Sequence, residues 1–190
     1  MAQLLVYTKN ITLRYAVNSL VEDKNDVTFF DNRLQFLVCA TVLKDANLLI
    51  DALYGNSEDI LWLYPKLRLR GIEKNVHYFV PTRITPNSYM KDFSLITDIL
   101  KLKSLCRASG KRHASFNTAD IQSIILRNLS NRMNDNDLNF ILTRYTGLHC
   151  KSKELTRKET EKLYYIRKKL FLQNSTELKQ LILLLSEKNT

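Results

Sequence analysis

The sequence predicts an α/β N-terminal domain built on a parallel sheet, followed by an all-α C-terminal domain. Short apolar runs alternate with helix-patterned runs through residues 3–82, which is typical of βαβ units. From Phe116 onward the patterns are helical only. The charge also changes along the chain: residues 1–105 carry 13 Lys and Arg against 11 Asp and Glu, whereas residues 106–190 carry 16 against 8.

Apolar spacing defines the elements of the first part. Continuous or alternating apolar runs predict strands, and apolar residues three and four apart predict helices. The predicted strands are 3–8, 26–31, 46–53 and 75–82, and the predicted helices are 11–23, 33–45, 57–71 and 88–106. Pro65 lies inside the third helix, so we expect that helix to bend or divide there.

The C-terminal part begins after a small, basic, glycine-containing segment at 107–115. Such a composition is typical of a linker, and we predict domains at 1–105 and 116–190 joined by a linker at 106–115. The predicted helices of the second domain are 117–133, 134–147, 156–171 and 174–187.

Capping residues mark where these helices begin and end. Asn134 is a good N-cap for the second helix, and Gly147 is a natural stop for it. The other two starts show the spacing of a capping box, in Thr156 with Glu159 and in Asn174 with Glu177.

Several classes of protein are not indicated. The longest apolar runs fall far short of the roughly 20 residues of a membrane helix, and the start lacks signal-peptide features, so we expect a cytoplasmic protein. Cys39, Cys106 and Cys150 are odd in number and widely spaced, which favours reduced thiols, and metal-ligand spacing is lacking. Glycine-rich phosphate loops and nucleophile motifs are also lacking, so we expect no enzyme activity, metal or cofactor.

The excess positive charge points to a polyanion partner. On the helix at 156–171, Leu163, Ile166 and Leu170 form one apolar stripe, and the remaining positions are largely charged. A short helix with an inward apolar stripe and outward basic side chains fits a DNA major groove. The alternative is a solvated helix with pairs such as Arg157 and Glu161, four residues apart.

Three segments resemble the LuxR-type helix-turn-helix domain. "IRKKLFLQNSTELKQLI" (166–182) is similar to the end of the recognition helix and the start of the last helix. "RMNDNDLNFIL" (132–142) and "FNTADIQSII" (116–125) resemble the two preceding helices, although about ten extra residues lie between Leu142 and Leu170. The resemblance implies a double-stranded DNA partner. Its contacts to phosphates and base edges would come from Lys151, Lys153, Arg157, Lys158 and Lys162, and Arg167 and Lys168 would hold the flanking backbone.

A second registration leads to a different function. "LTRKETEKL" (155–163) also resembles the opening of the same domain, and "LSEKNT" (185–190) then resembles the start of its recognition helix. In that registration the chain ends before the recognition helix forms. It implies an interaction protein that sequesters or modulates another transcriptional regulator without binding DNA.

The first domain resembles the receiver domain of response regulators. The resemblance places Asp51 at the phosphoacceptor position and Thr82 at the hydroxyl position. Tyr7, Thr8 and Lys9 stand where a receiver has its acidic pair, so Mg²⁺ would lack oxygen ligands. We therefore expect a degenerate, phosphorylation-independent pseudo-receiver.

The two resemblances together imply a bacterial regulator of a particular kind. A chain with both resemblances is similar in character to accessory regulators of fimbriae, capsule or other surface structures. Such regulators often pair with a second regulator, which implies a homodimer or heterodimer here. The helix at 88–106 is the expected interface.

Overall fold

The computed structural model describes residues 3–21, 26–52, 57–80, 93–110, 121–145 and 155–186. Its sheet has five strands in the order β2-β1-β3-β4-β5, and every neighbouring pair is parallel. The strands are β1 (Leu4–Tyr7), β2 (Val27–Phe30), β3 (Asn47–Asp51), β4 (Val76–Phe79) and β5 (Ser94–Ile96). The predicted parallel α/β architecture is therefore confirmed.

The described helices account for most of the remaining chain. Around the sheet they are α1 (Ile11–Leu20), α2 (Arg33–Val42), α3 (Ser57–Leu69), the 3₁₀ turn η2 (Glu73–Asn75) and α4 (Ile99–Gly110). Beyond it they are α5 (Ile121–Ser130), α6 (Asp135–Asn139), the π-helix η4 (Phe140–Tyr145), α8 (Arg157–Lys169) and α9 (Ser175–Ser186). Among these described helices, none combines the length and apolar character needed to span a membrane.

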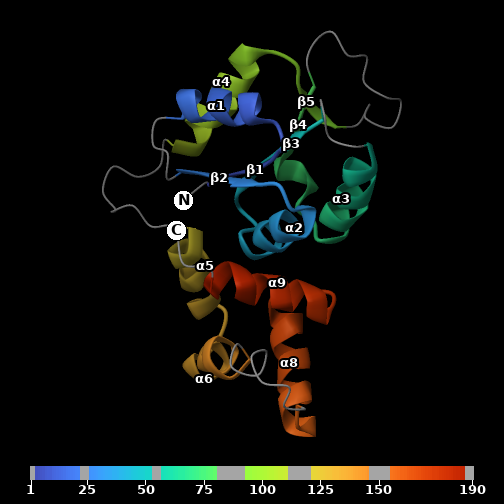
Figure 1. The fold of residues 1–190 in the computed structure, drawn as a ribbon, viewed down its shortest axis with the longest axis vertical. Coiled ribbons are helices and arrows are strands. Elements are labelled where there is room, and N and C mark those ends of the chain that lie inside the picture. Colours follow the sequence, from blue (N-terminus) through green and yellow to red (C-terminus); the bar gives the residue numbers. More distant parts are fainter. Residues whose placement is uncertain are drawn as a thin grey trace.

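The central strands β1 and β3 are buried on both faces, as parallel strands between helical layers must be. In β1, Leu5 and Tyr7 enter one core cluster, and Leu4 and Val6 enter the other. Helices α1 and α4 cover the second face, whereas α2 and α3 cover the first (Figure 1). Asparagine caps start the helices that follow β1 and β2, because Asn10 and Asn32 accept hydrogen bonds from backbone N–H groups of the first turn.

The helix predicted at 88–106 is wrong over its middle. Residues 94–96 form β5, and α4 begins only at Ile99. Leu95 and Ile96 pack on opposite faces of the sheet, so their adjacent apolar side chains satisfy a strand as well as a helix. The carboxylate of Asp98 then accepts a hydrogen bond from the N–H of Lys101 and starts α4. Residues 88–92 lie outside the described part.

The structure also differs from the prediction at α3, at α4 and at the helix predicted for residues 134–147. Helix α3 is a single helix with Pro65 inside it, so of the expected bend or division the division does not occur. Helix α4 continues to Gly110 and includes residues 106–110 of the predicted linker, whereas 111–115 lie outside the described residues. The π-helix η4 directly follows α6, within the single helix predicted at 134–147.

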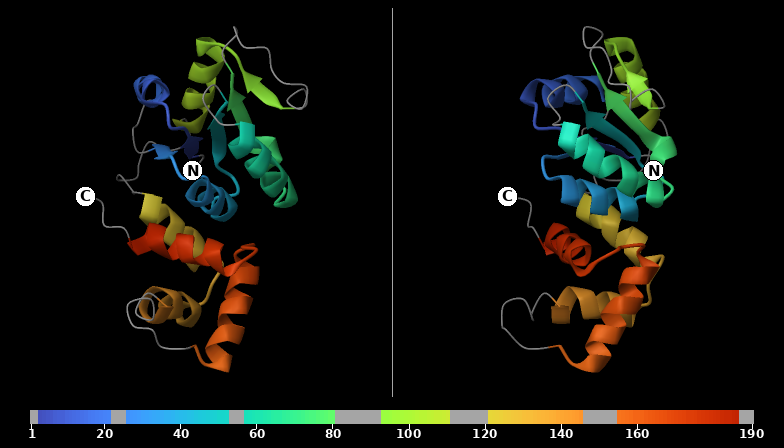
Figure 2. Two further views of the ribbon diagram at one scale, coloured as in Figure 1. Left: turned by 45° about the vertical axis from the view of Figure 1, so that its right-hand side comes forward. Right: turned by 90° about the vertical axis from the view of Figure 1, so that its right-hand side faces the viewer.

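The C-terminal helices share one core with the sheet. A single buried cluster includes Phe36 of α2, Leu63 of α3, Ile125 of α5 and Leu181 of α9. Helices α5 and α9 lie directly against α2 in all views (Figures 1 and 2). The separate all-α domain that the sequence predicts is thus not confirmed, because these helices are packed on the outer side of α2.

A buried ion pair fastens α9 to the end of α3. An Nη2 donor of Arg70 lies 2.7 Å from Oε1 of Glu177, and only 2% and 3% of these side chains are exposed. Arg70 also donates to the carbonyl oxygen of Lys66, and Glu177 accepts from the N–H of Gln173. Gly71 follows with φ +67°, a left-handed conformation that glycine adopts without a Cβ penalty at a helix end.

The turn between α8 and α9 contains a strained residue. Phe171 has φ +60°, which is unfavourable for a residue with a bulky side chain. The N–H of Leu172 bonds to the carbonyl of Arg167, so Phe171 closes α8 where glycine is usual. Lys44, next to β3, places its ammonium 3.3 Å from the Phe171 ring centroid. This turn is therefore held against the sheet part.

We expect Arg70→Met to lower the free energy of unfolding by about 3–5 kcal/mol, because it leaves the Glu177 charge buried without its partner. Urea unfolding followed by circular dichroism measures the change. Glu161→Gln, which removes the charge from an exposed pair, is the control and should change stability by less than about 1 kcal/mol. An Arg70→Met loss as small as the control's would contradict the role given to the buried pair.

Candidate functional site

Among the described helices, α8 presents a basic surface and extends away from the sheet (Figures 1 and 2). A complete capping box starts it: the Thr156 side chain accepts from the N–H of Glu159, and the Glu159 carboxylate accepts from the N–H of Thr156. Its 13 residues span roughly 20 Å. Because its last turn leads into α9, which packs on α2, its first turn lies at the distal end of the molecule (Figures 1 and 2).

Asp137 of α6 fixes α8 in place. Its carboxylate oxygens lie 3.4 Å from Nζ of Lys162 and 3.0 Å from Nζ of Lys169. Burial opposes ionisation of Asp137, but the hydrogen bonds and charges of these two lysines outweigh it and lower its pKa. Lys162 also donates to the carbonyl oxygen of Asn136 and lies over the Phe140 ring. The sequence assigns Lys162 to DNA, yet the structure engages it in helix packing.

The outward face of α8 combines basic and aromatic side chains. Arg157 is 93% exposed, Lys158 is exposed, and Tyr165 is 65% exposed. The guanidinium of Arg167 and the ammonium of Lys168 both lie over the Tyr164 ring, at 5.6 and 4.8 Å from its centroid. Tyr164 thus orders two of the predicted DNA-contacting cations on the surface.

The structure brings five of the seven predicted DNA-binding residues onto one helix. Lys151 and Lys153 lie outside the described residues. Sequence reasoning missed Tyr164, Tyr165 and the anchoring carboxylate of Asp137. The run "YYIRKK" was a usable signal for the tyrosines, since aromatic residues among basic ones are typical of nucleic-acid surfaces. The role of Asp137 depends on a helix crossing that no local pattern shows.

A second polar cluster lies at the carboxyl ends of β1 and β3. Strand order reverses between these two strands, which is the usual ligand position in doubly wound sheets. Asp51 ends β3, is 2% exposed, and accepts a hydrogen bond from the Thr8 hydroxyl at 2.6 Å. The carboxylate at the predicted degenerate phosphoacceptor position is therefore covered by a neighbouring side chain. Thr82 lies outside the described residues.

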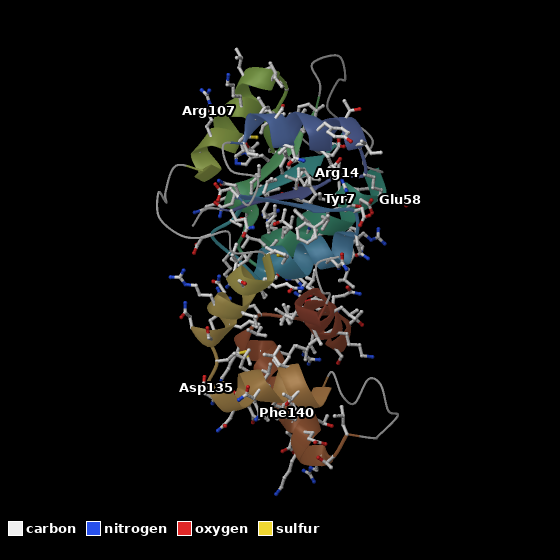
Figure 3. All side chains as sticks on the ribbon, turned by 60° about the vertical axis from the view of Figure 1, so that its left-hand side comes forward. Tyr7, Arg14, Glu58, Arg107, Asp135 and Phe140 are labelled. Atoms are coloured by element: carbon white, nitrogen blue, oxygen red, sulfur yellow. The ribbon has the colours of Figure 1, made fainter. Side chains whose placement is uncertain are left out.

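Asp59, at the start of α3, accepts hydrogen bonds from three other side chains at this edge of the sheet. It accepts hydrogen bonds from Tyr7 at 2.6 Å, from Arg33 at 2.9 Å and from Lys9 at 3.4 Å. Burial opposes its ionisation, but these donors and the charge of Lys9 outweigh that effect and lower its pKa. Burial and then the bond to Asp59 raise the pKa of Tyr7. Figure 3 shows Tyr7 and Glu58, the neighbour of Asp59, on the same side of the sheet.

These residues do not fit a magnesium-dependent phosphoacceptor site. Mg²⁺ requires several hard oxygen ligands, but the positions after β1 are Thr8 and Lys9, and Lys9 already pairs with Asp59. Within the described part of the chain, no three His, Cys, Asp or Glu residues are grouped so that they could hold a metal ion. A lysine or arginine side chain beside a carboxylate supplies the positive charge that a bound metal ion would otherwise supply.

Comparisons of the chain with models of protein families, with curated proteins and with solved structures found no match.

The Asp59 cluster predicts a specific pH dependence. Because folding lowers the pKa of Asp59, its ionised form stabilises the fold above the unfolded pKa, near 3.9, and this contribution is lost as the pH falls through the folded pKa. Asp59→Asn should be less stable than the native chain by about 1–3 kcal/mol at pH 7, and the difference should shrink below about pH 4.

Urea unfolding at pH 3, 5 and 7 measures this difference. Glu58→Gln, at the exposed neighbour in the same helical turn, is the matched control and should change stability little at any of these pH values. A difference for Asp59→Asn that stays constant down to pH 3 would show that the carboxylate charge is not what stabilises the cluster.

Proposed function

We propose that this protein binds double-stranded DNA through α8 and acts as a transcriptional regulator of the helix-turn-helix class. The observation that carries the proposal is the basic and aromatic face of α8, a helix that is anchored to α6 and extends away from the sheet (Figure 2). A helix anchored by a preceding helix and exposed along one side has the form needed to enter a major groove.

The side chains available for DNA differ from those engaged in packing. Lys162 and Lys169 pair with Asp137, whereas Lys158 makes no hydrogen bond or ion pair within the described residues. Lys168 is exposed over Tyr164. Lysines that neutralise phosphates gain affinity through counterion release, so Lys158 and Lys168 supply the phosphate contacts in this proposal.

Regulation by this protein is proposed to be independent of phosphorylation. The strand order β2-β1-β3-β4-β5 agrees with a receiver-like domain, but Asp51 is covered by Thr8 and the edge carries cations in place of acidic ligands. Control of genes for surface structures such as fimbriae remains part of the proposal on the strength of the sequence resemblance.

An interaction protein that modulates another regulator is the second candidate. The observation that favours it lies on α1 and α4, which are neighbours on one face of the sheet. Both helices begin with exposed apolar side chains, namely Ile11, Tyr15, Ile99 and Leu100. Exposed apolar groups on adjacent helices are typical of protein contacts. A dimer formed through α1 and α4 would leave α8 accessible at the other end of the molecule.

The double variant Lys158→Ala/Lys168→Ala should bind every duplex more weakly. Loss of two phosphate contacts reduces the slope of log affinity against log salt by about two units. Fluorescence anisotropy with a genomic fragment and an unrelated duplex, between 50 and 200 mM salt, measures the slope. Lys101→Ala/Arg107→Ala removes two exposed charges from α4 and is the matched control. Equal slopes for both double variants would favour the interaction protein.

Asp51→Asn should leave DNA binding unchanged, because asparagine keeps an oxygen that accepts from Thr8. Incubation of the native chain with Mg²⁺ and a small acyl phosphate should give no phosphorylated product by intact-mass spectrometry. A mass increase that disappears in Asp51→Asn, together with altered DNA affinity, would show that phosphorylation controls the protein.

A further inference from the structure

Arg157 and Glu161 form a pair whose geometry leaves part of the arginine available. Nε of Arg157 donates to Oε1 of Glu161 at 3.1 Å, one helical turn away. The pair uses only this nitrogen, and the terminal nitrogens Nη1 and Nη2 make no hydrogen bond to any described residue. Glu161 therefore holds the guanidinium plane while its outer edge remains open to solvent.

Stability does not explain this pair. The side chains are 93% and 57% exposed, and pairs of this kind contribute at most a few tenths of a kcal/mol. A carboxylate on a DNA-facing helix also repels phosphates, so Glu161 opposes the function proposed for α8 unless it has a positive role there. Orientation of Arg157 supplies such a role.

We infer that Arg157 reads a guanine in the major groove and that Glu161 is its positioning residue. The two Nη donors of an arginine match O6 and N7 of guanine in a bidentate contact, the commonest specific contact to DNA. A guanidinium fixed through Nε presents this fork with less loss of side-chain freedom on binding. The inference rests on the proposed function and names the base that the helix recognises.

The placement of Arg157 on α8 agrees with this role. It is the first residue of the helix, and the N-terminal residues of a recognition helix are those that contact base edges. Residues 157, 161, 164 and 168 are spaced four, three and four residues apart. They therefore lie along one side of α8, opposite the buried Ile166. The guanine reader thus lies at the distal tip, and the cations held over Tyr164 lie nearer the sheet.

Other basic side chains of α8 are less suited to read a base. Lys162 and Lys169 are turned toward Asp137. Arg167 lies over Tyr164 and within 3.4 Å of the Ser175 hydroxyl, toward α9. Among the described arginines of this helix, Arg157 alone has its fork directed away from protein partners.

The test starts with selection of bound sequences from a randomised duplex library by the full-length native chain. Affinities are then measured for the selected duplex and for its three alternatives at each guanine of the site. Arg157→Lys keeps the charge but loses the fork, so preference for one guanine should fall roughly 5- to 150-fold. The salt slope should stay unchanged, because the charge is retained.

Glu161→Ala separates positioning from charge. It should weaken preference for the same guanine and raise affinity for unrelated duplexes, because a negative charge is removed beside the phosphates. Glu161→Gln keeps an acceptor for Nε and should retain more of the preference than Glu161→Ala. A merely structural pair would move none of these ratios, and thermal melting checks that each variant is folded.

The outcomes separate this inference from the proposed function. Unchanged guanine preference in Arg157→Lys, or equal preference in Glu161→Ala and the native chain, overturns the inference while DNA binding stands. Failure of the native chain to enrich any sequence overturns both. A guanine preference lost in Arg157→Lys and partly retained in Glu161→Gln supports the inference.

Discussion

The arrangement of the molecule depends on the buried contact between Arg70 and Glu177. These two side chains join the end of α3 to the first turn of α9, far apart in sequence, with almost no solvent access. A charge in that position is unfavourable without its partner, so the pair specifies one docking of α9 against the sheet part. Apolar side chains of α2, α5 and α9 then close the shared core around it.

The direction of α8 follows from this docking. Four residues separate the end of α8 from the capping residue of α9, and within them Phe171 adopts a left-handed conformation that costs about 1–3 kcal/mol. Burial of Leu170 and Leu172 and the contact of Lys44 with the Phe171 ring offset that strain. The basic face of α8 is consequently held at a defined angle to the sheet, which suits a rigid recognition helix.

Charged side chains are paired with each other at the sheet edge, whereas several on α8 are exposed. At the sheet edge, cations close around Asp59 and a hydroxyl covers Asp51, so each carboxylate is satisfied by neighbouring side chains. On α8, the internal pairs with Asp137 account for two lysines and leave the others exposed along one face. Paired carboxylates at the sheet edge and exposed basic side chains on α8 agree with the proposed regulator, whose DNA binding would not require phosphorylation.

Local information in the sequence determined the first four strands, two of the helix caps and the basic character of the segment at 156–171. Apolar periodicity and capping residues act over a few neighbours, so the Asn134 cap and the Thr156 capping box were predicted correctly. The fifth strand was not, because Leu95 and Ile96 fit two periodicities and only the adjacent β4 decides between them. Tertiary structure alone decided that α9 packs on α2, that Lys162 turns to Asp137 and that Thr8 covers Asp51. Each of these contacts joins residues distant in sequence, and their partners are set by helix packing and strand order, which no local pattern contains.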